Sequence, residues 1–184
     1  MADLFVYCPA CGDRGITFHQ DKQYFCKHCG FEYFHNVATA AGVFVVSKGR
    51  LLCLVRAQEP GKGLLSLPGG FVDPGERAED AVRRECREEV GLNLESIHFL
   101  CTFPNEYRFR NMLYHTCDLY FYSHNDELEP DMLIAAQDEV SSFSFIPLQE
   151  VDPLRFAFPA ARKAWEFFVE TPVFDKLAQY GDIL

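Results

Sequence analysis

The sequence lacks a long apolar run and has no run of basic residues. A membrane-spanning helix needs about 20 consecutive, mostly apolar residues, and no segment reaches this length. The start of the chain, MADLFVYCPA, also lacks the basic stretch and the apolar stretch of a secretory signal. We therefore expect a soluble, cytoplasmic protein with no membrane partner.

Positive charge is scarce. Lysine and arginine together number 17 against 27 aspartates and glutamates, and the formal net charge is −10. A general nucleic-acid binder needs a basic face to neutralise phosphates, so the composition disfavours nucleic acid as a partner. An acidic protein can still bind a phosphate-bearing small molecule if divalent cations stand between its carboxylates and the phosphates.

Disorder is also disfavoured, because charged residues make up only 24% of the chain and hydrophobic residues 48%. The 18 Phe and 8 Tyr are ample for a packed core. We find no internal repeat and no low-complexity tract. A length of 184 residues is typical of one domain with a small appendage.

Half of the eight cysteines stand in two CxxC pairs, CPAC and CKHC, separated by 14 residues. In a reducing compartment this spacing is typical of a tetrahedral zinc site rather than of disulfides. Four thiolates leave no open position for water, so the zinc is expected to be structural. We predict a zinc ribbon over residues 1–36 and a second domain over 37–184, with Zn²⁺ bound by Cys8, Cys11, Cys26 and Cys29.

Zinc ribbons can bind nucleic acid, which is the alternative role for residues 1–36. Their basic residues are outnumbered by acidic ones, and phosphate neutralisation needs the opposite. Aromatic residues of the segment could stack on bases, although core and interface packing is their commoner use. We favour a packing or dimerisation module, with which a homodimer is compatible. The basic residues of this segment are Arg14, Lys22 and Lys27, and the acidic ones are Asp3, Asp13, Asp21 and Glu32.

The second domain begins with an apolar segment, Val37–Val46, which predicts a buried strand. The turn SKGR and a second strand at Leu51–Arg56 complete a hairpin. LPGGFVDPGE is expected to be a loop. A helical pattern follows from about Arg77 to Val90, and Gly91 stands at the position of a C-terminal cap.

Three further strands are predicted at Ile97–Phe103, Leu113–Tyr122 and Ser141–Ile146. The polar segment NEYRFRN is expected to connect the first two. Pro159–Glu170 is predicted to be a helix with Pro at its start. Because strands and helices are mixed without strict alternation, we expect an α/β fold, an α/β/α sandwich with a mixed sheet.

The most informative segment is Gly70–Leu92, GFVDPGERAEDAVRRECREEVGL. At about 100° per residue, Glu85, Glu88 and Glu89 fall within a sector of about 100°. Such a carboxylate cluster suits a hard divalent cation, and the LPGG loop lets the backbone pass close to it. The helix pattern alone nevertheless favours a solvated, salt-bridged face, as in most charge-rich helices.

The same segment resembles the Nudix box, Gx5Ex7REUxEExGU, in which U is an aliphatic residue. Cys86 and Leu92 stand at the U positions, and Cys86 is the small departure from the pattern. The preceding LVRAQEPGKGLLSLPGG is similar to the family's approach to its box, except that Leu65 stands where Trp is common. The chain is therefore identified as a member of the Nudix hydrolase superfamily. The matching fixed positions are Gly70, Glu76, Arg84, Glu85, Glu88, Glu89 and Gly91.

The resemblance implies a role for each matching residue. Glu85, Glu88 and Glu89 would bind the catalytic Mg²⁺ or Mn²⁺, and one of them would serve as the base. The Gly69 carbonyl would be a further ligand.

Three residues would support this group. Glu76 and Arg84 would orient the loop against the helix, with Arg84 in a salt bridge. Family members often recruit one more acid ahead of a late strand, and QDEVSSFSF offers Glu139. A solvated loop position is an equally good interpretation of Glu139.

These roles imply a metal-dependent pyrophosphohydrolase, in which metal-bound water attacks phosphorus in line. A zinc ribbon ahead of a Nudix domain resembles the architecture of the bacterial NADH pyrophosphatases. The chain lacks their SQPWPFPxS signature and carries CTFPNEYRFRNMLYHTCDLYF in its place. We therefore expect a nucleoside diphosphate linked to a second moiety, such as a dinucleotide or ADP-ribose, without choosing among them.

Four residues after the box are candidates for substrate binding. Phe103 and Tyr107 could stack on a base, while Arg108 and Arg110 could meet phosphate or ribose oxygens. A polar hairpin with aromatics packed beneath it explains the same residues. Two other functional classes stay open: a nucleotide sensor without turnover and a nucleic-acid-associated zinc-ribbon module. The complete set of acids favours catalysis over the sensor.

Overall fold

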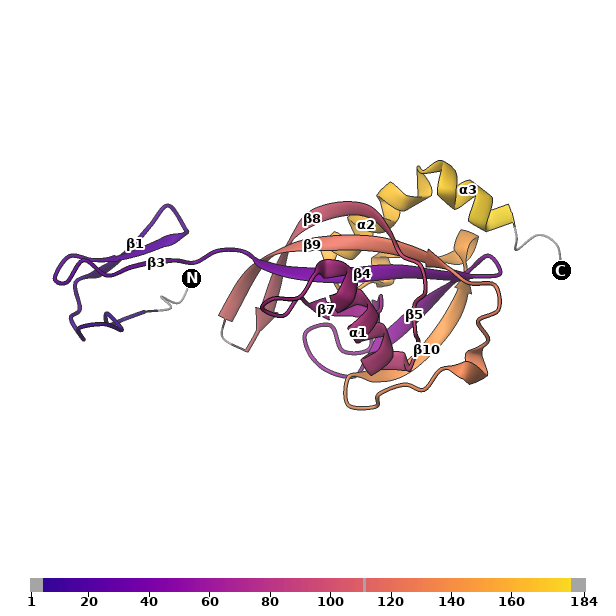
Figure 1. Ribbon diagram of the computed structural model, residues 1–184, viewed down its shortest axis with the longest axis horizontal. Helices are drawn as coiled ribbons and strands as arrows, with labels where there is room; N and C mark the ends of the chain where they lie inside the picture. The colour runs from indigo at the N-terminus through magenta and orange to yellow at the C-terminus, as the bar shows by residue number, and fades with distance from the viewer. Residues whose placement is uncertain (1–4, 111, 180–184) are drawn as a thin grey trace.

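The computed structural model describes residues 5–110 and 112–179. Near the N-terminus, three antiparallel strands form a small sheet, β1 (Ile16–His19), β2 (Gln23–Cys26) and β3 (Glu32–Phe34). This sheet lies at one end of the molecule (Figure 1). The boundary that we propose between residues 36 and 37 falls between β3 and the first strand of a second sheet.

The second sheet has seven strands and is mixed. The order β10-β5-β4-β9-β8 runs across it, with β6 paired to β5 and β7 to β4. Only the β4–β9 pair is parallel among the strands described. In chain order the strands are β4 (Ala38–Ser47), β5 (Arg50–Arg56), β6 (Leu65–Ser66), β7 (Gly69–Phe71), β8 (His98–Phe109), β9 (Met112–His124) and β10 (Val140–Pro147).

Helices cover the second sheet from both sides (Figure 1). Helix α1 (Ala78–Val90) packs on one face, and α2 (Pro159–Val169) with α3 (Pro172–Ala178) packs on the other. The expected α/β/α sandwich is thereby confirmed. Among the described residues, no helix has the length and apolar character needed to cross a bilayer. Three short 3-10 helices lie in the connections, η1 (Pro130–Met132), η2 (Leu148–Glu150) and η3 (Pro153–Arg155).

Strand β4 separates the two halves of the core. Phe44 packs with Trp165 and Phe168 of α2, whereas its neighbours Val43 and Val45 join the residues of α1 on the opposite face. All three β4 residues are fully buried, as expected for a strand covered on both faces. This double burial explains why the segment has a continuous apolar sequence.

Residues with positive φ form the turn between β4 and β5 and the C-terminal end of α1. Lys48 and Gly49 turn the β4–β5 hairpin, and both have positive φ, 49° and 68°, as a two-residue hairpin turn requires. Gly91 ends α1 in the left-handed conformation, with φ of 72°. Its N–H donates to the Arg87 carbonyl, so the predicted C-terminal cap is confirmed.

Two predicted loops are strands instead. Gly69–Phe71, inside the predicted loop LPGGFVDPGE, forms β7 and pairs with β4. Most of the segment NEYRFRN is strand rather than connection, because β8 continues to Phe109 and pairs with β9 along its length. Every second side chain of this stretch is turned inward. The residues between them are exposed and mostly polar, which is why the sequence pattern favoured a loop. Helix α3 was not predicted.

Candidate active site and zinc site

A cleft of about 500 Å³ lies where α1, β7 and β4 meet the strands β8 and β9. Three groups of residues line it. Acidic residues lie along one side, namely Glu85, Glu88, Glu89 and Glu139. Aromatic residues form a wall, Phe71, Tyr107, Phe109 and Phe158. A polar end is formed by Asn105, Thr116, Asp118 and Tyr120.

The glutamates of α1 differ in their surroundings. Glu89 is buried, and its Oε2 accepts a hydrogen bond of 2.9 Å from the Gly69 N–H. Burial raises the pKa of Glu89 to about 8, and repulsion from Glu85 and Glu139 adds to this. Burial also raises the pKa of Glu85, with repulsion from Glu88 and Glu139 acting in the same direction. The side chain of Glu88 is 59% exposed.

Arg84 holds the acidic residues together. Its guanidinium donates to both carboxylate oxygens of Glu76 at 3.0 Å, to Glu85 at 2.7 Å and to Glu88 at 3.1 Å. It also donates to the carbonyl of Phe71 at 3.0 Å, which ties α1 to β7. Hydrogen bonding from Arg84 lowers the pKa of Glu76. The salt bridge expected of Arg84 is thus present, and it includes the proposed metal ligands themselves.

The glycines ahead of the helix allow this close approach. A Cβ on Gly70 would lie 2.4 Å from Oε1 of Glu85. A Cβ on Gly69 would lie 2.2 Å from the carbonyl oxygen of Ala41, and Gly69 has φ of 148°. Any larger residue at either position would collide with the strand or with the carboxylate.

The donor set of this side of the cleft fits Mg²⁺ or Mn²⁺. All candidate ligands are oxygens, which both ions prefer. Burial is the main cause that raises the pKa of Glu85 and of Glu89, and repulsion between the neighbouring carboxylates acts in the same direction, so a divalent cation at this side of the cleft would stabilise their charged forms. Among the described residues, only four cysteines bring three or more ligand atoms within 4.8 Å of one another. The carboxylates would therefore reach a cation partly through its waters, which Mg²⁺ retains readily.

Glu139 lies at the end of the loop before β10 and lines the same cleft as the glutamates of α1. The backbone holds this position, because the Glu139 carbonyl accepts a hydrogen bond of 2.9 Å from the Ala57 N–H. Repulsion from Glu139 acts on both Glu85 and Glu89. The fold therefore brings Glu139, which is distant from α1 in the sequence, to the acidic side of the cleft.

Of the four residues proposed to bind substrate, Tyr107 lines the cleft. Its ring lies 5.5 Å from that of Phe71 and 5.7 Å from that of Phe158, measured between centroids. The other three are not among the described residues that line the cleft. Phe103 packs against the core, Arg108 is exposed on the opposite face of β8, and the Arg110 guanidinium lies 5.2 Å from the Phe109 ring.

Sequence reasoning missed four charged residues that line the cleft, Arg56, Glu59, Asp73 and Asp118, of which Arg56 and Asp118 bear on ligand binding. Arg56 ends β5, and its guanidinium lies 4.9 Å from the Phe158 ring centroid. Asp118 lies in the middle of β9 and is 7% exposed. A signal existed for Asp118, because it is the one acidic residue in the predicted strand Leu113–Tyr122 and stands between the apolar residues Cys117 and Leu119. No signal in the sequence indicated Arg56.

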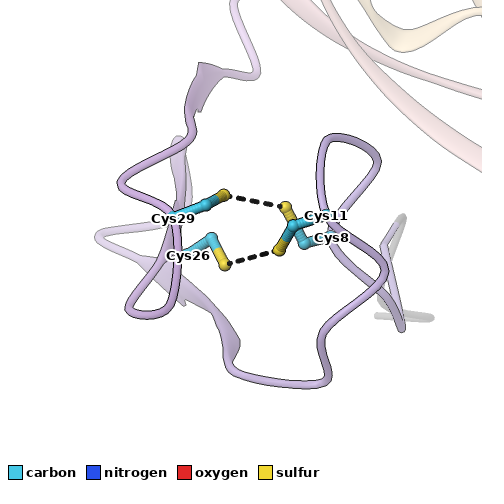
Figure 2. Close-up of side chains that lie close together, drawn as sticks. All are labelled: Cys8, Cys11, Cys26 and Cys29. Atoms are coloured by element: carbon cyan, nitrogen blue, oxygen red, sulfur yellow. Dashed lines mark hydrogen bonds between the residues drawn. The ribbon is translucent and has the colours of Figure 1, made fainter.

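The N-terminal cysteines form a compact group (Figure 2). The Sγ atoms of Cys8 and Cys29 are 3.7 Å apart, as are those of Cys11 and Cys26. Four ligands at the Zn–S distance of about 2.3 Å in a regular tetrahedron lie about 3.8 Å from one another. The spacing of the thiols therefore fits a tetrahedral zinc ion.

Two glycines shape the cysteine knuckles. Gly12 and Gly30 each directly follow a CxxC pair, and both have φ of 75°. Their N–H groups donate to the carbonyls of Cys8 and Cys26, at 2.8 and 2.9 Å. The two knuckles thus repeat one backbone turn, and each turn brings its cysteine pair to the same point.

A comparison with family models shows to which protein family the chain belongs. The model of the NUDIX domain matches residues 36–167, more than half of the chain. The chain belongs to the Nudix hydrolase family. Its sheet and helices therefore follow a known architecture.

Relatives and solved structures agree with this membership. The NAD-capped RNA hydrolase NudC of Pseudomonas syringae is 25% identical over 89% of this chain and 54% of its own length. Its counterpart in Pseudomonas entomophila is 23% identical over 97% and 59%. This chain thus spans little more than half the length of these curated relatives. A MutT NUDIX hydrolase from Burkholderia pseudomallei aligns with a TM-score of 0.60 and 27% identity, over 71% of this chain and 97% of that one.

A structure of the NUDIX domain of Shewanella oneidensis NrtR complexed with ADP ribose shares the fold. It aligns with a TM-score of 0.58 and 23% identity, over 74% of this chain and 89% of that one. At this level of identity the likeness extends to the fold alone.

The exposed glutamate of the Nudix helix provides a test of the metal site. Glu88→Gln keeps the shape of the side chain and removes its charge, so we expect kcat to fall by about two orders of magnitude or more. Stability should change by less than about 0.5 kcal/mol, because Glu88 is exposed. Glu166→Gln, on the exposed side of α2, is the matched control. Full activity of Glu88→Gln would place the metal site elsewhere.

The zinc assignment is tested by metal content. Protein purified without added metal should contain about one zinc per chain, and Cys26→Ser should lose most of it. Because zinc binding contributes directly to the folding of such small sites, the variant's first 36 residues should become sensitive to limited proteolysis. Cys117→Ser, on β9, should keep its zinc. A metal-free protein with a protease-resistant N-terminus would contradict the assignment.

Proposed function

We propose that this protein hydrolyses the diphosphate bond of a nucleoside diphosphate linked to a second moiety, with dinucleotides and ADP-ribose as the leading substrates. The observation that carries the proposal is the cleft itself. Its acidic side suits cations that hold a diphosphate, and its aromatic wall suits a ring. A cavity of about 500 Å³ is also within the usual size range of small-ligand sites.

Glu85, Glu88 and Glu89 would hold Mg²⁺ or Mn²⁺, with the Gly69 carbonyl and Glu139 as further ligands. When bound, the cations supply the charge that neutralises the diphosphate and activates the attacking water. Arg84 keeps the carboxylates in place and would orient them toward the cations, with Glu76 fixing Arg84 from behind.

Proton transfer in this scheme falls to one of the glutamates. The elevated pKa of Glu89, about 8, shows that its surroundings favour a proton on this group before a cation arrives. A bound cation reverses this preference by favouring the carboxylate. Glu85 and Glu139 are the alternative bases, and mutation of each acid to its amide would separate them.

The rest of the substrate would lie along the aromatic wall. Tyr107 and Phe158 present ring faces or edges to the cleft, and Arg56 lies beside Phe158. Arg56 would meet a phosphate or ribose oxygen, since a guanidinium donates to two oxygens at once. We further propose that the zinc ribbon is structural and that it serves packing or dimerisation.

The relatives support this class of substrate. The two Pseudomonas proteins are named as hydrolases of NAD-capped RNA, and NAD contains two nucleosides joined by a diphosphate. The NrtR domain was solved with ADP ribose, which also contains a diphosphate. The net charge of −10 argues against a long RNA as the preferred substrate of this chain.

A substrate screen tests the proposal. Dinucleotides, ADP-ribose, nucleotide sugars and nucleoside triphosphates would be incubated with Mg²⁺ and with Mn²⁺, and the released phosphomonoester would be measured. We expect turnover of the diphosphate-linked compounds over the triphosphates. A protein that binds one of these compounds without turnover under either ion would be a ligand sensor instead, and calorimetry on the same panel detects that outcome.

The aromatic wall generates a prediction about recognition. If the substrate ring stacks on Tyr107, Tyr107→Ala should raise KM by about tenfold or more and change kcat little, because the interaction lost is the same in the ground state and in the transition state. The melting temperature is measured beside KM, and Tyr33→Ala on the exposed face of the ribbon is the control. An unchanged KM in a well-folded Tyr107→Ala would show that Tyr107 only packs against its neighbouring rings.

A further inference from the structure

Asp118 is a buried carboxylate at the end of the cleft away from the glutamates of α1. It lies on β9, on the same face of the sheet as Tyr120. In the register of the sheet, Ala40 of β4 is the partner of both Asp118 and Phe71. Neighbouring strands are about 4.8 Å apart, so Asp118 lies about 10 Å across the sheet from β7. The glutamate side and Asp118 thus mark two ends of one cleft.

Neutral donors surround Asp118. Its carboxylate accepts hydrogen bonds from the Thr116 hydroxyl at 2.5 Å, from the Asn105 side-chain nitrogen at 2.9 Å and from the Tyr120 hydroxyl at 3.4 Å. No cationic side chain forms an ion pair with it among the residues described. Burial raises the pKa of Asp118, in spite of the three donors. A carboxylate offers about four lone-pair sites, so there is room for a further donor.

Asn105 adds a second acceptor beside Asp118. A carboxylate only accepts, so Asn105 must turn its nitrogen toward Asp118. This leaves the side-chain oxygen of Asn105 buried and without a hydrogen-bond partner within the described part of the chain. A buried acceptor without a partner costs free energy, which a ligand donor would recover. Both residues line the cleft, so a ligand bound there lies beside both.

Resident cations do not account for this arrangement. Only one carboxylate is present, the remaining groups are neutral, and no group of three ligands that includes Asp118 was found among the described residues. No lysine or arginine in the described ranges forms an ion pair with Asp118, so its carboxylate would repel an anionic ligand group. What the two acceptors lack is a neutral N–H donor. An exocyclic amine or a carboxamide on an aromatic ring supplies two such N–H groups at one nitrogen.

We propose that Asp118, with Asn105 beside it, recognises the exocyclic amine or the carboxamide N–H group of the substrate's aromatic ring and thereby sets base specificity. The inference rests on the proposed function for its ligand class, a nucleotide. The same chemistry is present in adenine and in nicotinamide. Tyr107 lies on the same face of β8 as Asn105, two residues along the strand, so a ring held beside Asp118 can also reach the aromatic wall.

Binding to the wild-type protein gives the first test. Calorimetry with Mg²⁺ present compares AMP with IMP and nicotinamide mononucleotide with nicotinic acid mononucleotide, none of which contains a diphosphate bond to hydrolyse. In each pair the N–H donor is replaced by oxygen. We expect a loss of affinity of about 10- to 100-fold within one of the two pairs, because a hydrogen bond to a charged group is lost. The pair that responds identifies the ring. Equal affinity within both pairs would overturn the proposal, whether or not any variant folds.

Asp118→Asn gives the second test. The amide keeps the shape but can donate as well as accept, so the preference within the responding pair should shrink about tenfold or reverse toward the oxygen-bearing member. Asp131→Asn, exposed in η1, is the matched control and should keep the wild-type preference. A folded Asp118→Asn that weakens both members of the pair equally would show a structural role and overturn the proposal.

The binding readout separates this inference from the proposed function. If the protein turns over no diphosphate yet prefers the amine-bearing mononucleotide, the hydrolase proposal fails and the role of Asp118 stands. If dinucleotides are hydrolysed with kcat/KM values that do not distinguish NAD from its hypoxanthine and nicotinic acid analogues, the hydrolase stands and the role of Asp118 fails.

Discussion

Carboxylates gathered on one helix face repel one another, and the arrangement of the cleft depends on how this repulsion is offset. Arg84 contacts Glu76, Glu85 and Glu88 with one guanidinium. Burial nevertheless raises the pKa of Glu85 and of Glu89, and repulsion from Glu139 adds to this at both. Under the proposed function, the fold thus maintains a cluster of carboxylates that Arg84 stabilises and that a divalent cation would complete.

The same arginine links electrostatics to backbone geometry. Its bond to the Phe71 carbonyl fixes β7 against α1, and the Gly69 N–H reaches Glu89 across the same contact. Without a Cβ at Gly70, the carboxylate of Glu85 lies close to the strand backbone. The glycines, the arginine and the glutamates therefore form one structural unit, which is why they occur together within a short segment of sequence.

This local character explains what could be predicted from the sequence. The helix, its glycine cap, the β4–β5 hairpin and the cysteine pairs depend on residues close together in the chain, and each has a periodicity or spacing that indicates it. Glu139 lies farther away and could be indicated only through the family resemblance.

The remaining features depend on pairing between distant segments. The environment of Asp118 exists because β8 brings Asn105 opposite Thr116 of β9. Nothing near Asp118 in the sequence shows that partner. The length of β8 was underestimated for a related reason. The exposed residues of its second half are mostly polar. The inward-facing Asn105 and Tyr107 line a cleft that the sequence alone does not reveal.

The two ends of the cleft impose different requirements on a ligand. At the glutamate end, negative charge on the ligand is acceptable only through a divalent cation, because the protein itself is strongly acidic there. At the Asp118 end, the ligand must bring N–H donors and little charge. A phosphate-rich molecule without a ring would satisfy the first requirement alone, and a free nucleobase only the second. A nucleotide satisfies both, and its length separates the two groups across the strands of the sheet. Under the two proposals, an acidic protein would select a nucleotide without a basic surface: cations would supply affinity at the diphosphate, and a buried pair of acceptors would supply discrimination at the ring.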